Sequence, residues 1–134
     1  MTVDGLTTIL SAFGPKQTMD RLESEVKAKG LIVFARVDHA AGAAAVGLKL
    51  RPTELLIFGN ARGGTPLMEA DQRIGIDLPL KALVYQDEAG KVWLAYIDPR
   101  WLARRYGLSA AVAANVEGLS KALGSLAAAA AKSA

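Results

Sequence analysis

The amino-acid sequence predicts an α+β domain in which a mostly antiparallel β-sheet carries helices on one face, in a β-α-β(4)-α outline. Three observations lead to this fold class. The chain has 134 residues, a common size for one domain that buries its own core. Five short segments are rich in branched and aromatic residues, and two longer segments have apolar residues at helical spacing. We therefore treat residues 1–134 as a single domain.

The five expected strands are separated by turn and cap residues. They lie at residues 6–11, 31–38, 54–58, 81–86 and 91–97. Both faces of segment 31–38 are largely apolar for at least half their length, so this strand requires cover on both sides. The last two strands are joined by residues 87–90, a hairpin-length loop with Gly90 at its end. This spacing predicts a β-hairpin.

Two long helices are expected, at residues 14–29 and 109–131. Pro15 stands in the first turn of the first helix, where its missing N–H does no harm, and Gly30 suits a left-handed cap at its end. Ser109 caps the second helix, whose apolar residues alternate spacings of four and three. Shorter helices are expected at 41–46, at 67–70 after a Thr65-Pro66 start, and from Asp98-Pro99 to Gly107, with 59–64 as a flexible loop.

The C-terminal segment is so rich in alanine that a membrane-spanning helix has to be considered. Glu117 and Lys121 interrupt the apolar stretch, and the remainder is well short of the ~20 apolar residues that a bilayer requires. We therefore expect no membrane partner, and we expect residues 127–134 to fray. Residues 1–5 lack the basic and apolar regions of a signal peptide, which favours a cytoplasmic location.

Composition excludes several kinds of chemistry. The chain has no cysteine, which removes disulfides, thiolate metal sites and cysteine nucleophiles. It has one histidine, whereas a transition-metal enzyme generally needs several His, Cys or clustered carboxylates, so no metal or cofactor is expected. The net charge of +3 is small, and the arginines at 100, 104 and 105 have no aromatic platform or phosphate loop beside them. No nucleic-acid partner is expected.

A group of short motifs resembles a known family. They are Asp38-His39, Phe58-Gly59-Asn60, Gly64-Thr65-Pro66-Leu67-Met68, Leu78-Pro79-Leu80-Lys81 and the run Lys91-Val92-Trp93-Leu94-Ala95-Tyr96. Over residues 14–98 this pattern resembles the domain of unknown function 302 (DUF302) family, and it departs at Ala61, where that family usually has Pro after Asn. The resemblance implies an antiparallel sheet with helices on one face, similar in outline to TATA-binding-protein-like α+β folds. It implies no activity, and a shared fold does not bring DNA binding with it.

The same region contains the candidate site. His39 and Asn60 each follow directly on an expected strand, so we expect them to lie close together at one rim of the sheet as the polar groups of a ligand pocket. Phe58 and Met68 are the expected walls, and Asp38 and Thr65 complete the candidate set. Asp38, Asn60 and Thr65 are also typical cap and turn residues, and His39 also suits a partly buried histidine that bonds loop backbone.

Two functions remain open beside a module that binds a small ligand or a protein partner. A small enzyme would use His39 as general base, with Asp38 or Asp98 orienting it. A haem protein would use His39 and Met68 as axial ligands. Neither has a supporting cluster of residues in the sequence, so the binding module is preferred over an enzyme and over a purely structural module.

The strands carry apolar residues on both faces, which predicts an assembly. Two long helices cover only one broad face if the connections are short. A monomer would then expose an apolar patch larger than soluble monomers usually tolerate. We therefore expect a two-fold symmetric homodimer that buries at least one of Phe34, Tyr85, Trp93 and Tyr96.

Overall fold

The computed structural model describes residues 2–133 as one antiparallel sheet with helices packed against it. The strands are β1 (Leu6–Leu10), β2 (Ile32–Asp38), β3 (Thr53–Gly59), β4 (Leu80–Gln86) and β5 (Val92–Ile97), in the spatial order β1-β5-β4-β3-β2. The helices are α1 (Pro15–Ala28), α2 (His39–Ala45), α3 (Ala61–Ala70), α4 (Pro99–Arg105) and α5 (Ala113–Ala131), with 3₁₀ helices η1 (Gln72–Ile76) and η2 (Ala110–Val112). The predicted α+β class, the β-α-β(4)-α outline and the β4–β5 hairpin are confirmed.

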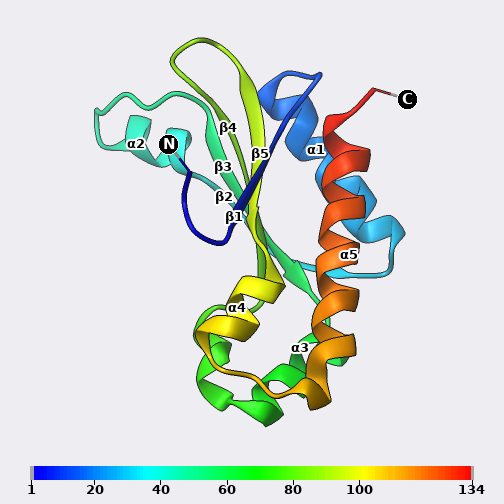
Figure 1. Cartoon of the computed structure of the whole chain (residues 1–134). Helices are drawn as coiled ribbons and strands as arrows, with labels where there is room; N and C mark the ends of the chain where they lie inside the picture. The colour runs from blue at the N-terminus through cyan, green and yellow to red at the C-terminus, as the bar shows by residue number, and fades with distance from the viewer. Residues whose placement is uncertain (1, 134) are drawn as a thin grey trace.

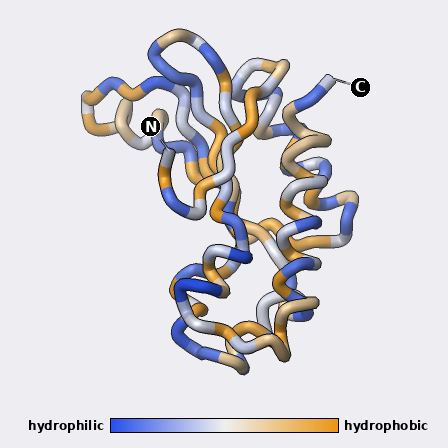
Figure 2. The backbone as a smooth tube through the Cα atoms, in the orientation of Figure 1, coloured by the Kyte–Doolittle hydropathy of each residue, from blue (hydrophilic) through white to orange (hydrophobic). Residues whose placement is uncertain are grey.

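The main core lies between the sheet and the two long helices. Figure 1 shows α1 and α5 side by side on one face of the sheet, with α2 on the other side. From α1, Met19, Leu22 and Val26 are buried at the spacing of one helical face. They meet alternate residues of the strands, such as Leu56 and Leu94. Figure 2 shows hydrophobic residues along these strands and hydrophilic residues at the turn between β4 and β5.

A second, smaller core lies beyond the end of the sheet. It joins α3, η1, α4 and the first turns of α5 through Leu67, Ile74, Leu102 and Val116. Figure 1 shows these short helices grouped below the sheet, to the left of the lower half of α5. The lower half of α5 therefore belongs to this second layer, and the upper half packs on the sheet and α1.

The structure corrects two expectations about helix ends. Residues 59–64 were expected to form a loop before a helix start at Thr65-Pro66, but α3 already begins at Ala61, because the Asn60 side chain accepts a hydrogen bond from the Gly63 N–H at 2.7 Å. Residues 127–134 were expected to fray, but α5 continues to Ala131, whose side chain is fully buried.

Arg21 explains why the end of α5 is ordered. Its guanidinium donates to the backbone oxygens of Ala129 at 2.8 Å and Ala130 at 3.0 Å, which satisfies carbonyls that have no partner within the helix. The N–H of Ala12 donates to the carbonyl of Ala131 at 2.7 Å. Tertiary hydrogen bonds thus replace the capping residue that the sequence does not provide.

The sheet face opposite α1 and α5 is apolar. It carries Leu55, Leu83, Tyr85, Trp93 and, fully buried among larger neighbours, Ala95. Tyr85 and Trp93 pair directly across β4 and β5. We call this set of five residues and their strand neighbours the helix-free face, because neither α1 nor α5 covers it; the short α2 lies beside β3 on this side of the sheet. Tyr96 is not part of it, because that side chain packs against the main core on the helix-covered side.

Candidate functional site

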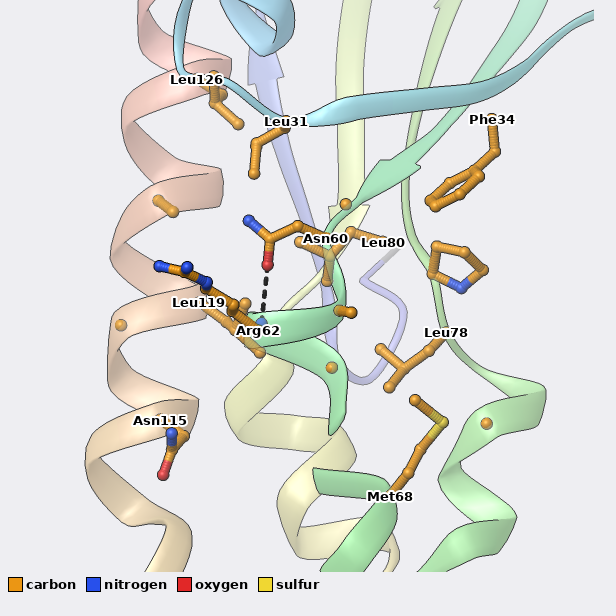
Figure 3. Close-up of a pocket in the computed structure, with 18 residues that line it drawn as sticks. Leu31, Phe34, Asn60, Arg62, Met68, Leu78, Leu80, Asn115, Leu119 and Leu126 are labelled. Atoms are coloured by element: carbon orange, nitrogen blue, oxygen red, sulfur yellow. Dashed lines mark hydrogen bonds between the residues drawn. The ribbon is translucent and has the colours of Figure 1, made fainter. Parts of the chain in front are cut away.

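A groove of about 630 Å³ opens at the end of the sheet where β3 passes into α3. Its walls come from the start of β2, the end of β3, the first turns of α3, the η1–β4 connection and the middle of α5 (Figure 3). The lining residues are Leu31, Phe34, Gly59, Asn60, Ala61, Arg62, Gly63, Gly64, Met68, Gly75, Leu78, Pro79, Leu80, Asn115, Gly118, Leu119, Ala122 and Leu126. Its volume and apolar lining are typical of small-molecule sites.

Asn60 occupies the middle of the groove. Because its Oδ1 is held by the Gly63 N–H, the orientation of the side-chain amide is fixed by the helix cap. Figure 3 shows the amide nitrogen turned toward Leu31 and Leu126. This leaves a hydrogen-bond donor directed into an otherwise apolar space.

The apolar walls lie on two sides of Asn60. Leu31, Leu119 and Leu126 form the side next to α5, and Phe34 lies on the other side with Met68 and Leu78 (Figure 3). Phe34 is 55% exposed, a large value for an aromatic side chain in a domain of this size.

Glycines make room between these walls. A Cβ atom at Gly63 would lie 3.0 Å from Leu119 Cδ2, so the close approach of α3 to α5 depends on the missing side chain. At Gly118, in contrast, a Cβ atom would meet nothing within 4 Å. Space is therefore open in front of Gly118, and a larger side chain there would enter the groove.

Few polar side chains line the groove, and one of them, that of Arg62, is positively charged. All lining residues lie within the described range 2–133, and among them Arg62 is the only ionisable one. Asn115 of α5 lies below Leu119 and Arg62 in Figure 3. None of the ion pairs within residues 2–133 involves Arg62, whereas Arg36, Arg73 and Arg100 all pair with carboxylates.

Two of the six predicted site residues line this groove. Asn60 and Met68 do, while Phe58 is fully buried in the main core beneath it and Thr65 is exposed on α3 without lining the groove. Asp38 lies elsewhere and caps α2, accepting a hydrogen bond from the Ala41 N–H at 2.9 Å. The cap interpretation of Asp38 is thus the one that the structure bears out.

The expected proximity of His39 and Asn60 is wrong. β2 and β3 are antiparallel, and Asp38 pairs with Glu54 while Ile32 pairs with Gly59. At roughly 3.3 Å per residue, Glu54 and Asn60 are roughly 20 Å apart along β3, so His39 and Asn60 lie at opposite ends of the sheet. His39 is exposed there and does not line the groove.

The same geometry bears on the two alternatives that use His39. Asp98 follows β5 at the end of the sheet that also carries Asn60, and its carboxylate bonds the Arg100 side chain and the Ser120 hydroxyl. His39 and Asp98 therefore do not face each other. Met68 also lies at the groove end, so His39 and Met68 are not placed as the two axial ligands of one haem.

Two further clusters of ionisable side chains lie outside the groove. Arg36 bonds Glu54 at 2.7 Å and also pairs with Asp20 and Glu23, which ties β2 to β3 and α1. Hydrogen bonds from Arg36 and then Lys16 hold the pKa of Asp20 below its usual range. These are surface ion pairs that join elements. Arg36 and Glu54 also line a second, more polar hollow of about 660 Å³ between α1, β2, α2 and β3.

The second cluster lies at the N-terminal end of β4. The Lys81 ammonium donates to the backbone oxygens of Asp77 at 3.2 Å and Pro79 at 3.0 Å, and burial lowers the pKa of Lys81. The Tyr106 hydroxyl donates to the Asp77 carboxylate, a bond that raises the pKa of Tyr106. Within residues 2–133 no group of three or more His, Cys, Asp or Glu side chains is arranged to hold a metal ion.

Sequence reasoning missed the α5 side of the groove. Asn115, Gly118, Leu119 and Ala122 contribute to it although they lie far along the chain from Asn60. A glycine in the middle of a long helix was the available signal, because it costs helix stability of about 1 kcal/mol and invites a packing or functional reason.

The fold and groove thus define a two-layer α+β domain with an apolar site at one end of its sheet. The chain belongs to the family described as "Domain of unknown function DUF302", which it matches over residues 7–126. It is similar to the crystal structure of an uncharacterized conserved protein DUF302 from Bacillus stearothermophilus, with a TM-score of 0.83 and 21% identity, covering 96% of this chain and 99% of that one. That likeness shows the shared fold.

Curated relatives are similar over part of their length. "Fluoride-specific ion channel FluC 1" of Brucella suis biovar 1 (strain 1330) is 50% identical over 111 residues, which is 81% of this chain and 44% of that protein. The protein of the same name from Brucella abortus biovar 1 (strain 9-941) is 50% identical over 111 residues, with 81% and 41% covered. The chain spans less than half the length of these relatives. Within residues 2–133, no helix is both long enough and apolar enough to cross a membrane.

Proposed function

We propose that this chain is a cytoplasmic binding module that takes up an apolar small ligand in the groove between β2, α3 and α5. One observation carries the proposal: a cavity of about 630 Å³ with apolar walls and a fixed amide donor at Asn60. The two clusters of ionisable side chains outside the groove are held in structural bonds, Arg36 to Glu54 and Lys81 to the backbone oxygen of Pro79. A binding role therefore has more support than catalysis.

A neutral dye tests this proposal. Nile red fluoresces more strongly in apolar surroundings, so its emission should rise when it is titrated with the protein. Gly118→Phe places a ring in the open space in front of Gly118 and should abolish that rise. Gly118→Ala is the matched control: it should leave dye binding intact and raise helix stability by about 1 kcal/mol. Equal dye binding by both variants would show that the dye binds outside this groove and would contradict the proposal.

We further propose a homodimer formed by the helix-free face. Five strands about 4.8 Å apart and about 20 Å long present roughly 500 Å² in plan, more than the few hundred Å² usually left exposed. Val46, Leu48 and Leu50 lie 73, 65 and 50% exposed next to it, between α2 and β3. The combined surface is comparable to the roughly 800 Å² per subunit that a stable dimer buries.

The solution mass tests the dimer. Light scattering at micromolar protein should give about twice the subunit mass of 14.1 kDa. Leu83→Asp puts a carboxylate at the centre of the helix-free face and should yield folded monomers, while Arg104→Glu on exposed α4 should leave the mass unchanged. A wild-type mass of 14.1 kDa would contradict the proposal.

A second candidate function follows from the Brucella relatives. In those proteins the matched segment and the remainder belong to one chain, and covalent linkage keeps two parts at high effective concentration. We propose that this chain also acts as a partner of a fluoride channel. The remainder of the B. suis protein, expressed without its matched segment, should co-purify with this chain when the two are mixed in detergent. Absence of a complex, when the intact B. suis protein is well folded under the same conditions, would remove this candidate.

A further inference from the structure

The charge distribution of the groove narrows the class of ligand. Of the lining residues, all within the described range, one is a cation, Arg62, two are neutral amides, Asn60 and Asn115, and none is acidic. We infer that the ligand is a single-chain amphiphile with an anionic head group, whose head lies at Arg62 and whose tail lies along the apolar walls. This inference rests on the groove-binding function proposed above.

Arg62 is available for a ligand anion. It is the second residue of α3, and Figure 3 shows its guanidinium beside Leu119 and above Asn115. Three other arginines are bonded to carboxylates: Arg36 to Glu54 at 2.7 Å, Arg73 to Asp71 at 2.8 Å and Arg100 to Asp98 at 2.8 Å. What distinguishes Arg62 is that it lines the groove and has no such pair. No ion pair within residues 2–133 involves Arg62, so its guanidinium can form a charge-assisted hydrogen bond with a carboxylate or phosphate in the groove without breaking an existing salt bridge.

The walls suit an unbranched hydrocarbon tail. Leu31, Leu119 and Leu126 offer aliphatic contacts on the α5 side of the groove. On the opposite side, the flexible Met68 side chain can adapt to a ligand, and Phe34 offers the flat surface of its ring. Each methylene transferred from water to such a surface is worth about 0.8 kcal/mol, which corresponds to roughly a fourfold gain in affinity. Affinity should therefore rise with chain length until the groove is filled.

Other head groups are disfavoured by the same charge. A cationic head would be repelled by Arg62 with no lining carboxylate to compensate. A neutral head would place Arg62 beside the ligand without a counter-charge. Because Arg62 is exposed, solvent screens the interaction, and the preference for an anion over a neutral head should be about fivefold, the upper end for an exposed ion pair.

Three ligands with one chain length test the inference. Decanoate, decan-1-ol and decylammonium share their tail and differ in head charge, and calorimetric titration at pH 7 should rank them in that order of affinity. Arg62→Met should weaken decanoate about fivefold and leave decan-1-ol unchanged, while Arg62→Lys should keep most of the preference. Equal affinity for decanoate and decan-1-ol would overturn the inference while the proposed function stands.

Further measurements distinguish failure of this inference from failure of the groove-binding function, and a membrane lipid from a free fatty acid as the ligand. If none of the three amphiphiles binds and Nile red does not bind either, the proposed groove function fails together with the inference. If Nile red binds and no amphiphile does, the inference alone fails. Co-sedimentation with vesicles of phosphatidylglycerol, but not of phosphatidylcholine, in an Arg62-dependent manner would identify a membrane lipid as the source. Decanoate binding without vesicle binding would identify a free fatty acid.

Discussion

Replacing Gly5 with alanine tests the packing that holds β1 to the rest of the molecule. Gly5 has φ of +78°, and a Cβ atom added there would lie 2.4 Å from Cδ2 and 2.5 Å from Cγ of Trp101. No side chain tolerates such distances, so the half-buried Trp101 ring of α4 must move out of the second core. The left-handed backbone adds a cost of roughly 1–2 kcal/mol for any residue with a Cβ atom.

Gly47 separates these two costs. Its φ is +80°, nearly that of Gly5, but an added Cβ atom would meet nothing within 4 Å. Gly47→Ala therefore measures the backbone cost, reduced by the smaller entropy of the unfolded chain, at roughly 1 kcal/mol. Gly5→Ala should cost a further 1–3 kcal/mol or so, the typical penalty for overpacking.

Urea unfolding followed by tryptophan fluorescence and circular dichroism measures both variants. In a Trp101→Leu background the extra cost of Gly5→Ala should largely disappear, because contacting residues are energetically coupled. Equal destabilisation by Gly5→Ala and Gly47→Ala in the wild-type background would refute the reasoning, since it would mean that the indole ring of Trp101 does not lie against Gly5.

Three further predictions concern the core, the charges and the histidine. Phe58→Ala, at a fully buried site, should lower the free energy of unfolding by about 3–5 kcal/mol in urea. Hydrogen bonds from Lys27 and then Arg36 lower the pKa of Glu23, so their stabilisation is present above the unfolded pKa of about 4.3 and is lost as the pH falls through the folded value. Arg36→Met should weaken this acid dependence in unfolding curves between about pH 6 and pH 3. His39→Ala, at an exposed position outside the groove, should change stability by less than about 0.5 kcal/mol and leave Nile red binding unchanged.

Local signals in the sequence predicted the elements well. Asp98 accepts a hydrogen bond from the Arg100 N–H at 2.9 Å, as its position before α4 indicated. Ser109 also accepts one, from the Ala111 N–H at 3.3 Å, but it caps η2 and not the long helix, which begins only at Ala113. Both are interactions within a few residues, which the type and order of residues largely determine. The hairpin was predicted for the same reason.

The site was harder to predict because it depends on which end of the sheet each strand reaches. His39 and Asn60 both follow strands, and the prediction joined them without using the antiparallel direction of β2 and β3. That direction was already part of the predicted fold class, so the signal existed. A glycine within a long helix could have drawn attention to Gly118, but the sequence does not indicate that it lies opposite Asn60, because that depends on how α5 packs against α3.

The pairing of β1 with β5 has a consequence for how the protein is made. Leu6 pairs with Ile97, so β1 has no strand neighbour until β5 has left the ribosome, about 90 residues later. Contacts between residues so distant in sequence are slow to form, because the loop between them must be closed first. During synthesis β1 therefore waits, unpaired, for β5, and Arg21 can secure the end of α5 only after residues 129 and 130 have been made.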